Sequence, residues 1–140
     1  MAFQEKSAWI MSLALLLGGL FYFGVVAWMS SQIGELAPPI LPLVAVYTVI
    51  LIIIAIVGHV VIAVFAPKDA NTALDERERQ IFDRAGHLSG YVVGVGVLLS
   101  LGLYLFSYSG NLLFYGVFAS LMISQLAEYA IQIFLYRSGV

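Results

Sequence analysis

The chain has 140 residues, of which 62% are hydrophobic and only 10% are charged, and its formal net charge is −2. A soluble domain carries about 25% charged residues, so this composition excludes a soluble globule and indicates a membrane protein. The sequence contains no cysteine, which excludes disulfides, thiolate metal sites and thiol redox chemistry.

Four apolar runs are long enough to cross a bilayer, which takes roughly 20 residues of helix. The predicted helices cover about residues 8–29, 40–66, 73–107 and 112–136. These runs do not alternate with polar residues as the strands of a membrane barrel do, and a helix satisfies its own backbone hydrogen bonds in lipid. The sequence therefore predicts one all-α membrane domain over residues 1–140, a four-helix bundle made of two hairpins.

The connections between the predicted helices differ in length and character. The first contains Pro38 and Pro39, which cannot continue a helix. The third, around residues 109–111, is short enough to be a tight turn between antiparallel helices. The first helix is expected to be retained rather than cleaved, because the Glu5 and Lys6 side chains before it carry no net positive charge.

A strongly charged segment follows the second apolar run, and the third helix is expected to begin inside it, near Ala73. Thr72 and Asp75 have the spacing of a capping box. The charged side chains of this segment are Asp75, Glu76, Arg77, Glu78, Arg79, Asp83 and Arg84. They form either a solvated extension of the helix or a docking surface for a protein partner or neighbouring subunit. Four acidic residues against three arginines argue against a nucleic-acid partner.

Glycines form a stripe on the third predicted helix. Gly86, Gly90 and Gly94 recur every four residues, and small residues at this spacing let membrane helices approach closely. The stripe packs either inside one protomer or at the seam of a homo-oligomer. A dimer is the favoured oligomer, because four helices make a small bundle and a full transport pathway would often need a second copy.

The basic residues are distributed unevenly over the connections. They lie before the first helix, between the second and third, and after the fourth, and none lies in the other two connections. The six are Lys6, Lys68, Arg77, Arg79, Arg84 and Arg137. Positively charged loops stay in the cytoplasm, so both termini and the central loop are predicted to be cytoplasmic.

Two ionisable residues lie deep inside the apolar runs, His59 in the second and Glu128 in the fourth. Each stands nine residues before a basic residue, Lys68 or Arg137. At 1.5 Å per helical residue, both lie about 13 Å from the same membrane boundary. Ionisable groups at such a depth are rare and usually functional, so this pair is the candidate site.

Polar residues accompany Glu128 on its helix. Gln125 and Gln132 share its face, and Tyr129 is one position further round. The pair of His59 and Glu128 either fixes helix packing through a hydrogen bond, or binds a proton or small ligand in a transport or sensing protein, or acts as acid and base on a lipid-soluble substrate. No metal or other cofactor is expected, because these residues together with His87 supply too few ligands.

The segment Asp75–Ile81, followed by Arg84, Ala85 and a glycine-rich helix, resembles a signature of small bacterial four-helix membrane proteins of uncharacterised activity. The resemblance covers mainly residues 72–105 and implies a protein of the bacterial inner membrane. It carries over no functional residue. From the intramembrane pair, the expected function is non-enzymatic: binding, sensing or transporting a small solute or proton at His59 and Glu128. The alternative is a structural or regulatory subunit that acts through a protein partner.

Overall fold

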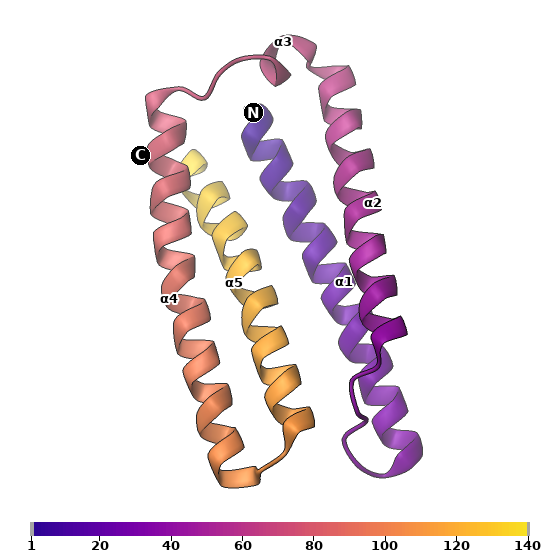
Figure 1. Cartoon of the computed structure of the whole chain (residues 1–140). Helices are drawn as coiled ribbons and strands as arrows, with labels where there is room; N and C mark the ends of the chain where they lie inside the picture. Colours follow the sequence, from indigo (N-terminus) through magenta and orange to yellow (C-terminus); the bar gives the residue numbers. More distant parts are fainter. Residues whose placement is uncertain (1, 140) are drawn as a thin grey trace.

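The computed structural model describes residues 2–139, which are helical apart from short connections and contain no strand. The helices are α1 (Phe3–Ile33), α2 (Leu41–Phe65), α3 (Pro67–Ala70), α4 (Glu76–Ser107) and α5 (Gly110–Ser138) (Figure 1). All except the single-turn α3 are long and apolar enough to cross a membrane. The prediction of an all-α protein with four membrane-spanning helices is confirmed at this level.

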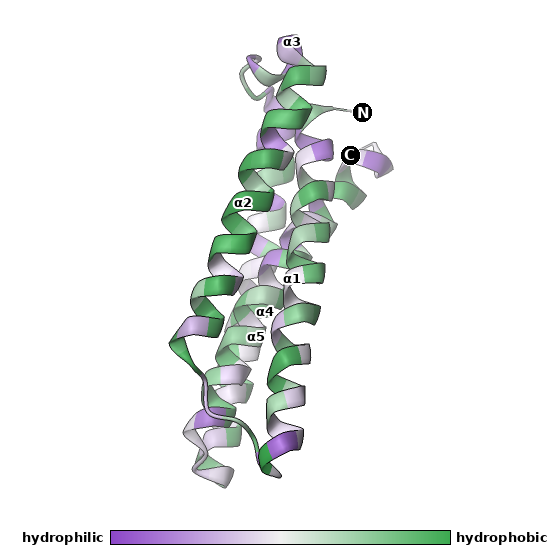
Figure 2. Ribbon diagram, turned by 90° about the vertical axis from the view of Figure 1, so that its right-hand side faces the viewer, coloured by the Kyte–Doolittle hydropathy of each residue, from purple (hydrophilic) through white to green (hydrophobic). Residues whose placement is uncertain are grey.

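The four long helices pack in the order α2, α1, α5, α4, so that α1 and α5 are central and α2 and α4 are the outer pair (Figure 1). Helix α1 packs against both α2 and α5, whereas α4 packs against α5. Both termini lie at the end that carries α3. The outer helix α2 is hydrophobic along most of its length (Figure 2), and Ile52, Ile56 and Val60 are exposed on it. Such a surface suits lipid rather than water.

Small residues bring α4 and α5 together through two reciprocal pairs. A Cβ atom added at Gly96 would lie 2.6 Å from the Cβ of Ser120, and one added at Gly116 would lie 3.0 Å from the Cβ of Ser100. Each serine hydroxyl donates at 2.7 Å to a carbonyl one turn earlier on its own helix, Ser100 to Gly96 and Ser120 to Gly116. The seam is therefore a close approach of two backbones, which only glycine permits opposite these serines.

Aromatic side chains join α1, α2 and α5 near the end opposite the termini. The rings of Tyr22 and Phe118 have centroids 4.6 Å apart, and those of Tyr22 and Tyr47 are 5.5 Å apart. The hydroxyl of buried Tyr115 donates at 2.9 Å to the carbonyl of Ala37. This bond ties α5 to the connection between α1 and α2, so the two hairpins are held together at this end.

The start of α4 differs from the prediction. Asp75 is the N-cap: its side chain accepts from the backbone N–H of Glu78 at 2.7 Å, and the Glu78 side chain accepts from the N–H of Asp75 at 3.2 Å. The predicted capping box of Thr72 and Asp75 is wrong, because the Thr72 hydroxyl instead donates to the carbonyl of Lys68 at 2.7 Å. The residues before Asp75 follow α3, so α4 begins at Glu76 rather than near Ala73.

Helix α1 begins earlier than predicted, at Phe3 rather than at residue 8. The charged residues that suggested a boundary are inside the helix. Glu5 is buried, and the Nε atom of Arg137 donates to it at 3.3 Å. Arg137 also lies over the ring of Trp9, with its guanidinium carbon 5.4 Å from the ring centroid. An ion pair and a cation–π contact therefore join the first turns of α1 to the end of α5.

Candidate functional site

His59 lies on α2 and faces α1. Its Nδ1 atom is 2.6 Å from the carbonyl oxygen of Ala55, and its Nε2 atom is 2.6 Å from the hydroxyl oxygen of Ser7. A carbonyl oxygen can only accept, so Nδ1 carries a proton and donates to Ala55, while Nε2 shares a hydrogen bond with the hydroxyl of Ser7. Both ring nitrogens are thus satisfied by short hydrogen bonds. This geometry explains His59 as a clamp between α1 and α2.

Glu128 lies half-buried on α5 and has weaker partners. One carboxylate oxygen is 3.5 Å from the hydroxyl of Ser89 on α4, and the other is 3.5 Å from Nε2 of Gln132. Both distances are at the outer limit of hydrogen bonding. The single proton of the Ser89 hydroxyl also has a nearer acceptor, the carbonyl of Gly86 at 3.0 Å. No Lys, Arg or His side chain forms an ion pair with Glu128 within residues 2–139.

Three further polar side chains complete a patch at the seam of α4 and α5, which we call the Glu128 cluster. Its members are Glu128, Ser89, Ser124 and Gln132. The Ser124 hydroxyl donates to the backbone carbonyl of Ser89 at 2.9 Å, and Gln132 is only 2% exposed. A polar patch of this kind inside a spanning segment is costly unless something satisfies its carboxylate.

The structure does not bring the two predicted residues into one contact. No hydrogen bond or ion pair between described residues joins His59 to Glu128, since His59 bonds to α1 and Glu128 to α4. Gln125 is exposed and does not take part in the cluster, and Tyr129 is half-buried beside it. Ser89 and Ser124 were missed. The spacing of Ser124, Glu128 and Gln132 at four-residue intervals could have found one of them.

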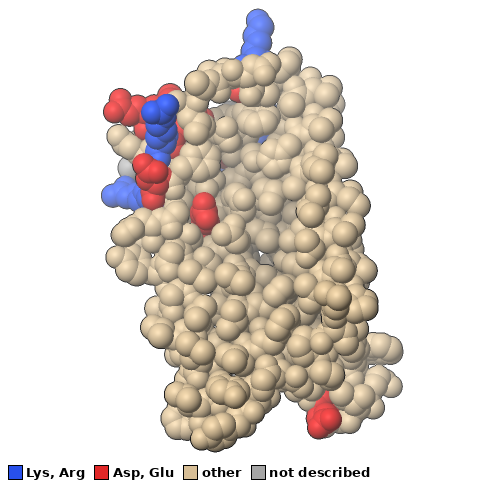
Figure 3. All heavy atoms as spheres, in the orientation of Figure 1, with Lys and Arg blue, Asp and Glu red and all other residues tan. Residues whose placement is uncertain are grey.

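Some residues of the charged segment form hydrogen bonds within the chain. Asp75 and Glu78 cap α4, and Nη2 of Arg77 donates at 3.3 Å to the backbone carbonyl of Tyr136, near the end of α5. Glu76, Arg79, Asp83 and Arg84 have exposed side chains. Charged residues gather at this end of the molecule, near α3 and the termini, on the face that Figure 3 shows.

Among residues 2–139, the Cβ side of the glycine stripe is open. A Cβ atom added at Gly86, Gly90 or Gly94 would meet nothing within 4 Å, and Gly90 and Gly94 are exposed. Packing within one protomer was one of two interpretations of this stripe, and the open space beside the three glycines gives it no support among the described residues. Gly96, two positions further along α4, makes the close approach to α5 instead.

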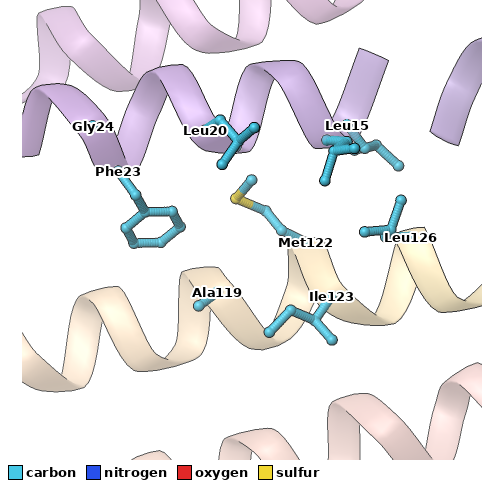
Figure 4. Close-up of a pocket in the computed structure, with 10 residues that line it drawn as sticks. Leu15, Leu20, Phe23, Gly24, Ala119, Met122, Ile123 and Leu126 are labelled. Carbon is cyan, nitrogen blue, oxygen red and sulfur yellow. The ribbon is translucent and has the colours of Figure 1, made fainter. Parts of the chain in front are cut away.

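A groove between α1 and α5 has a volume of about 500 Å³. Its lining is apolar, with Leu20, Phe23 and Met122 among the side chains that face it (Figure 4). Neither His59 nor any member of the Glu128 cluster lines it. Residues 2–139 contain no group of three His, Asp or Glu side chains that could hold a metal ion.

The site that emerges is a half-buried carboxylate with serine and glutamine neighbours and no basic partner among the described residues. Such a group can take up a proton, or accept hydrogen bonds and charge from a small cation. Comparisons with models of protein families, with curated proteins and with solved structures find no match to this chain.

Proposed function

We propose that this chain is a non-enzymatic membrane protein that binds a proton or a small cationic solute at Glu128, in a transport or sensing role. The observation that carries the proposal is the poorly satisfied carboxylate, with contacts of 3.5 Å to Ser89 and Gln132 and no ion-pair partner within residues 2–139. A bound proton or cation would remove the cost of burying that charge. His59 contributes by holding α1 against α2 rather than by touching the ligand.

The proposed orientation places both termini and α3 in the cytoplasm of a bacterium, with the helices in its inner membrane. All six Lys and Arg residues belong to the chain ends, to α3 or to the first turns of α4. The connection at the opposite end, between α1 and α2, carries Glu35 and no basic residue. This asymmetry supports the orientation through the positive-inside rule.

We further propose that the protein is a homodimer whose seam is the stripe of Gly86, Gly90 and Gly94. The stripe is open on its Cβ side, with nothing within 4 Å. A second α4 could approach it closely, as small residues at four-residue spacing permit in membranes. The exposed Gly90 and Gly94 would then be covered rather than left against lipid.

The function is tested by infrared difference spectroscopy of the protein in liposomes, with the pH stepped from about 4 to about 9. All eight Asp and Glu side chains can contribute carboxyl C=O bands as the pH falls, and the contribution of Glu128 should be missing from the difference spectrum of Glu128→Gln. Glu35→Gln is the matched control, since Glu35 is exposed in the connection between α1 and α2. Proton uptake into the same liposomes, followed with an internal pH dye, separates transport from binding alone.

The proposal fails if Glu128→Gln and the wild type give the same difference spectrum. That result would favour the second candidate, a structural or regulatory subunit that binds a protein partner through the charged segment. The exposed side chains of Glu76 and Arg79 support this candidate. Arg79→Glu should then abolish co-purification of the partner while the helical content stays unchanged.

A further inference from the structure

A polar recess lies at the seam of α4 and α5, where the charged part of α4 meets its apolar part. It has a volume of about 490 Å³, within the range of about 300–1,000 Å³ common for small-molecule sites. Four polar side chains of α4 line it, with apolar residues of α4 and α5 beside them. The lining residues are Gln80, Ile81, Asp83, Arg84, His87 and Leu135.

This recess, which we call the headgroup recess, lies at the depth of the membrane boundary. Arg84 is the last charged residue of α4, and the helix continues without charge to Ser107. The recess therefore stands where the polar headgroups of a bilayer meet the hydrocarbon core. Within residues 2–139 the side chains of Asp83 and Arg84 form no ion pair or hydrogen bond. One free anion and one free cation thus face the same recess.

An apolar groove lies further along the seam of α4 and α5, on the side away from α3. It has a volume of about 410 Å³ and is lined by Tyr91, Val95 and Ile123 among others. Arg84, Tyr91 and Val95 lie at i, i+7 and i+11, on one face of α4. The His87 ring meets the Tyr91 ring edge-on at 5.0 Å, which links the headgroup recess to the groove.

The length of the combined site matches a lipid. From Arg84 to Val95 the helix rises about 16 Å, and one leaflet of the hydrocarbon core is about 15 Å thick. A soluble phosphate would use the recess and leave the groove empty, whereas a phospholipid would fill both. Arg84, His87 and Gln80 can donate to a phosphate, and Asp83 can accept from an N–H donor.

We infer that this seam is a binding site for a zwitterionic aminophospholipid, with the phosphate at Arg84 and the ammonium group at Asp83. One acyl chain lies in the groove beside Tyr91 and Val95. An ethanolamine headgroup fits because its ammonium donates hydrogen bonds to Asp83, whereas the trimethylammonium of choline has no N–H to donate. The site contains no member of the Glu128 cluster, so the lipid test is independent of ligand binding at Glu128.

The test is native mass spectrometry of the delipidated full-length protein, titrated with phosphatidylethanolamine or phosphatidylcholine of identical acyl chains. The wild type should bind the ethanolamine lipid about tenfold more tightly. Asp83→Asn should remove that preference, and Arg84→Gln should weaken both lipids about tenfold. Arg79→Gln is the matched control: it loses the same charge from the same helix outside the recess, and should change binding less than about twofold.

Three results would overturn the inference. Equal effects of Arg79→Gln and Arg84→Gln would show diffuse charge attraction, and equal affinity of the wild type for both lipids would exclude a role for Asp83. Displacement of the lipid by millimolar inorganic phosphate would show a site for a soluble anion. If Arg84→Gln does not fold, as judged by circular dichroism, the headgroup preference of Asp83→Asn decides the matter alone.

Discussion

The reciprocal pairs of glycine and serine between α4 and α5 give the sharpest prediction about the fold. Replacing Gly96 by alanine would place a methyl group 2.6 Å from the Cβ of Ser120 and 3.4 Å from its Cα. A Cβ atom is fixed to the backbone and cannot rotate away as the end of a long side chain can. The two helices must therefore separate locally, and the hydrogen bond of Ser124 to the carbonyl of Ser89 lies on the same seam.

The expected loss follows from the cost of inserting a methyl group into a packed interface, about 1–3 kcal/mol. Gly102→Ala on the same helix is the matched control, because a Cβ atom there meets nothing within 4 Å. Gly102→Ala can raise helix stability by up to about 1 kcal/mol, and Gly96→Ala shares this gain, so the difference between the two variants isolates the clash. Combining Gly96→Ala with Ser120→Gly exchanges the partners across the seam and should recover most of the loss, since the two sites touch and their effects are not additive.

The assay is reversible unfolding in mixed micelles, with the free energy of unfolding measured by a denaturant titration for each variant. The order of stability should be wild type and Gly102→Ala first, then the double variant, then Gly96→Ala. Equal stability of Gly96→Ala and Gly102→Ala would refute the close approach at Gly96. Failure of Ser120→Gly to rescue would show that the clash is not with Ser120.

Two further predictions concern α2 and the outer face of α4. Ser7→Ala removes the partner of His59 Nε2 and should lower the free energy of unfolding by about 1 kcal/mol. The control Ser31→Ala removes an exposed serine whose hydroxyl donates to Trp28 on its own helix and should be neutral, so equal losses would contradict the clamp. Gly90→Ile should abolish energy transfer between labelled protomers in liposomes, and undiminished transfer would place any dimer seam elsewhere.

The span and apolar character of the long helices could be predicted from hydropathy, but their first turns could not. Glu5 was expected to lie before the first helix because it is charged, yet it is buried in α1 against Arg137, near the other end of the chain. An ion pair between residues so far apart in sequence leaves no local signal. Similarly, both Thr72 with Asp75 and Asp75 with Glu78 fit the capping-box spacing, and α3 decides between them.

For the candidate site, the depth of each residue could be predicted from the sequence, but contact between the residues could not. Depth is a count along one helix, so nine residues before Lys68 and before Arg137 place His59 and Glu128 at equal heights without any knowledge of the fold. Whether they meet depends on the order of the helices and the rotation of each about its axis. The order α2, α1, α5, α4 puts α1 between their helices, and Ser7 on α1 takes up His59.

Rotation also explains why the two residues differ in what they could bind. His59 meets a hydroxyl and a carbonyl at 2.6 Å each, so a ligand would have to displace good hydrogen bonds to reach it. Glu128 meets its partners at 3.5 Å, and one of them, Ser89, has a better acceptor in Gly86. A ligand at Glu128 would therefore contact a carboxylate while displacing only weak hydrogen bonds. The sequence indicated both residues because ionisable groups are rare inside a membrane, but the geometry favours Glu128 alone as a binding group.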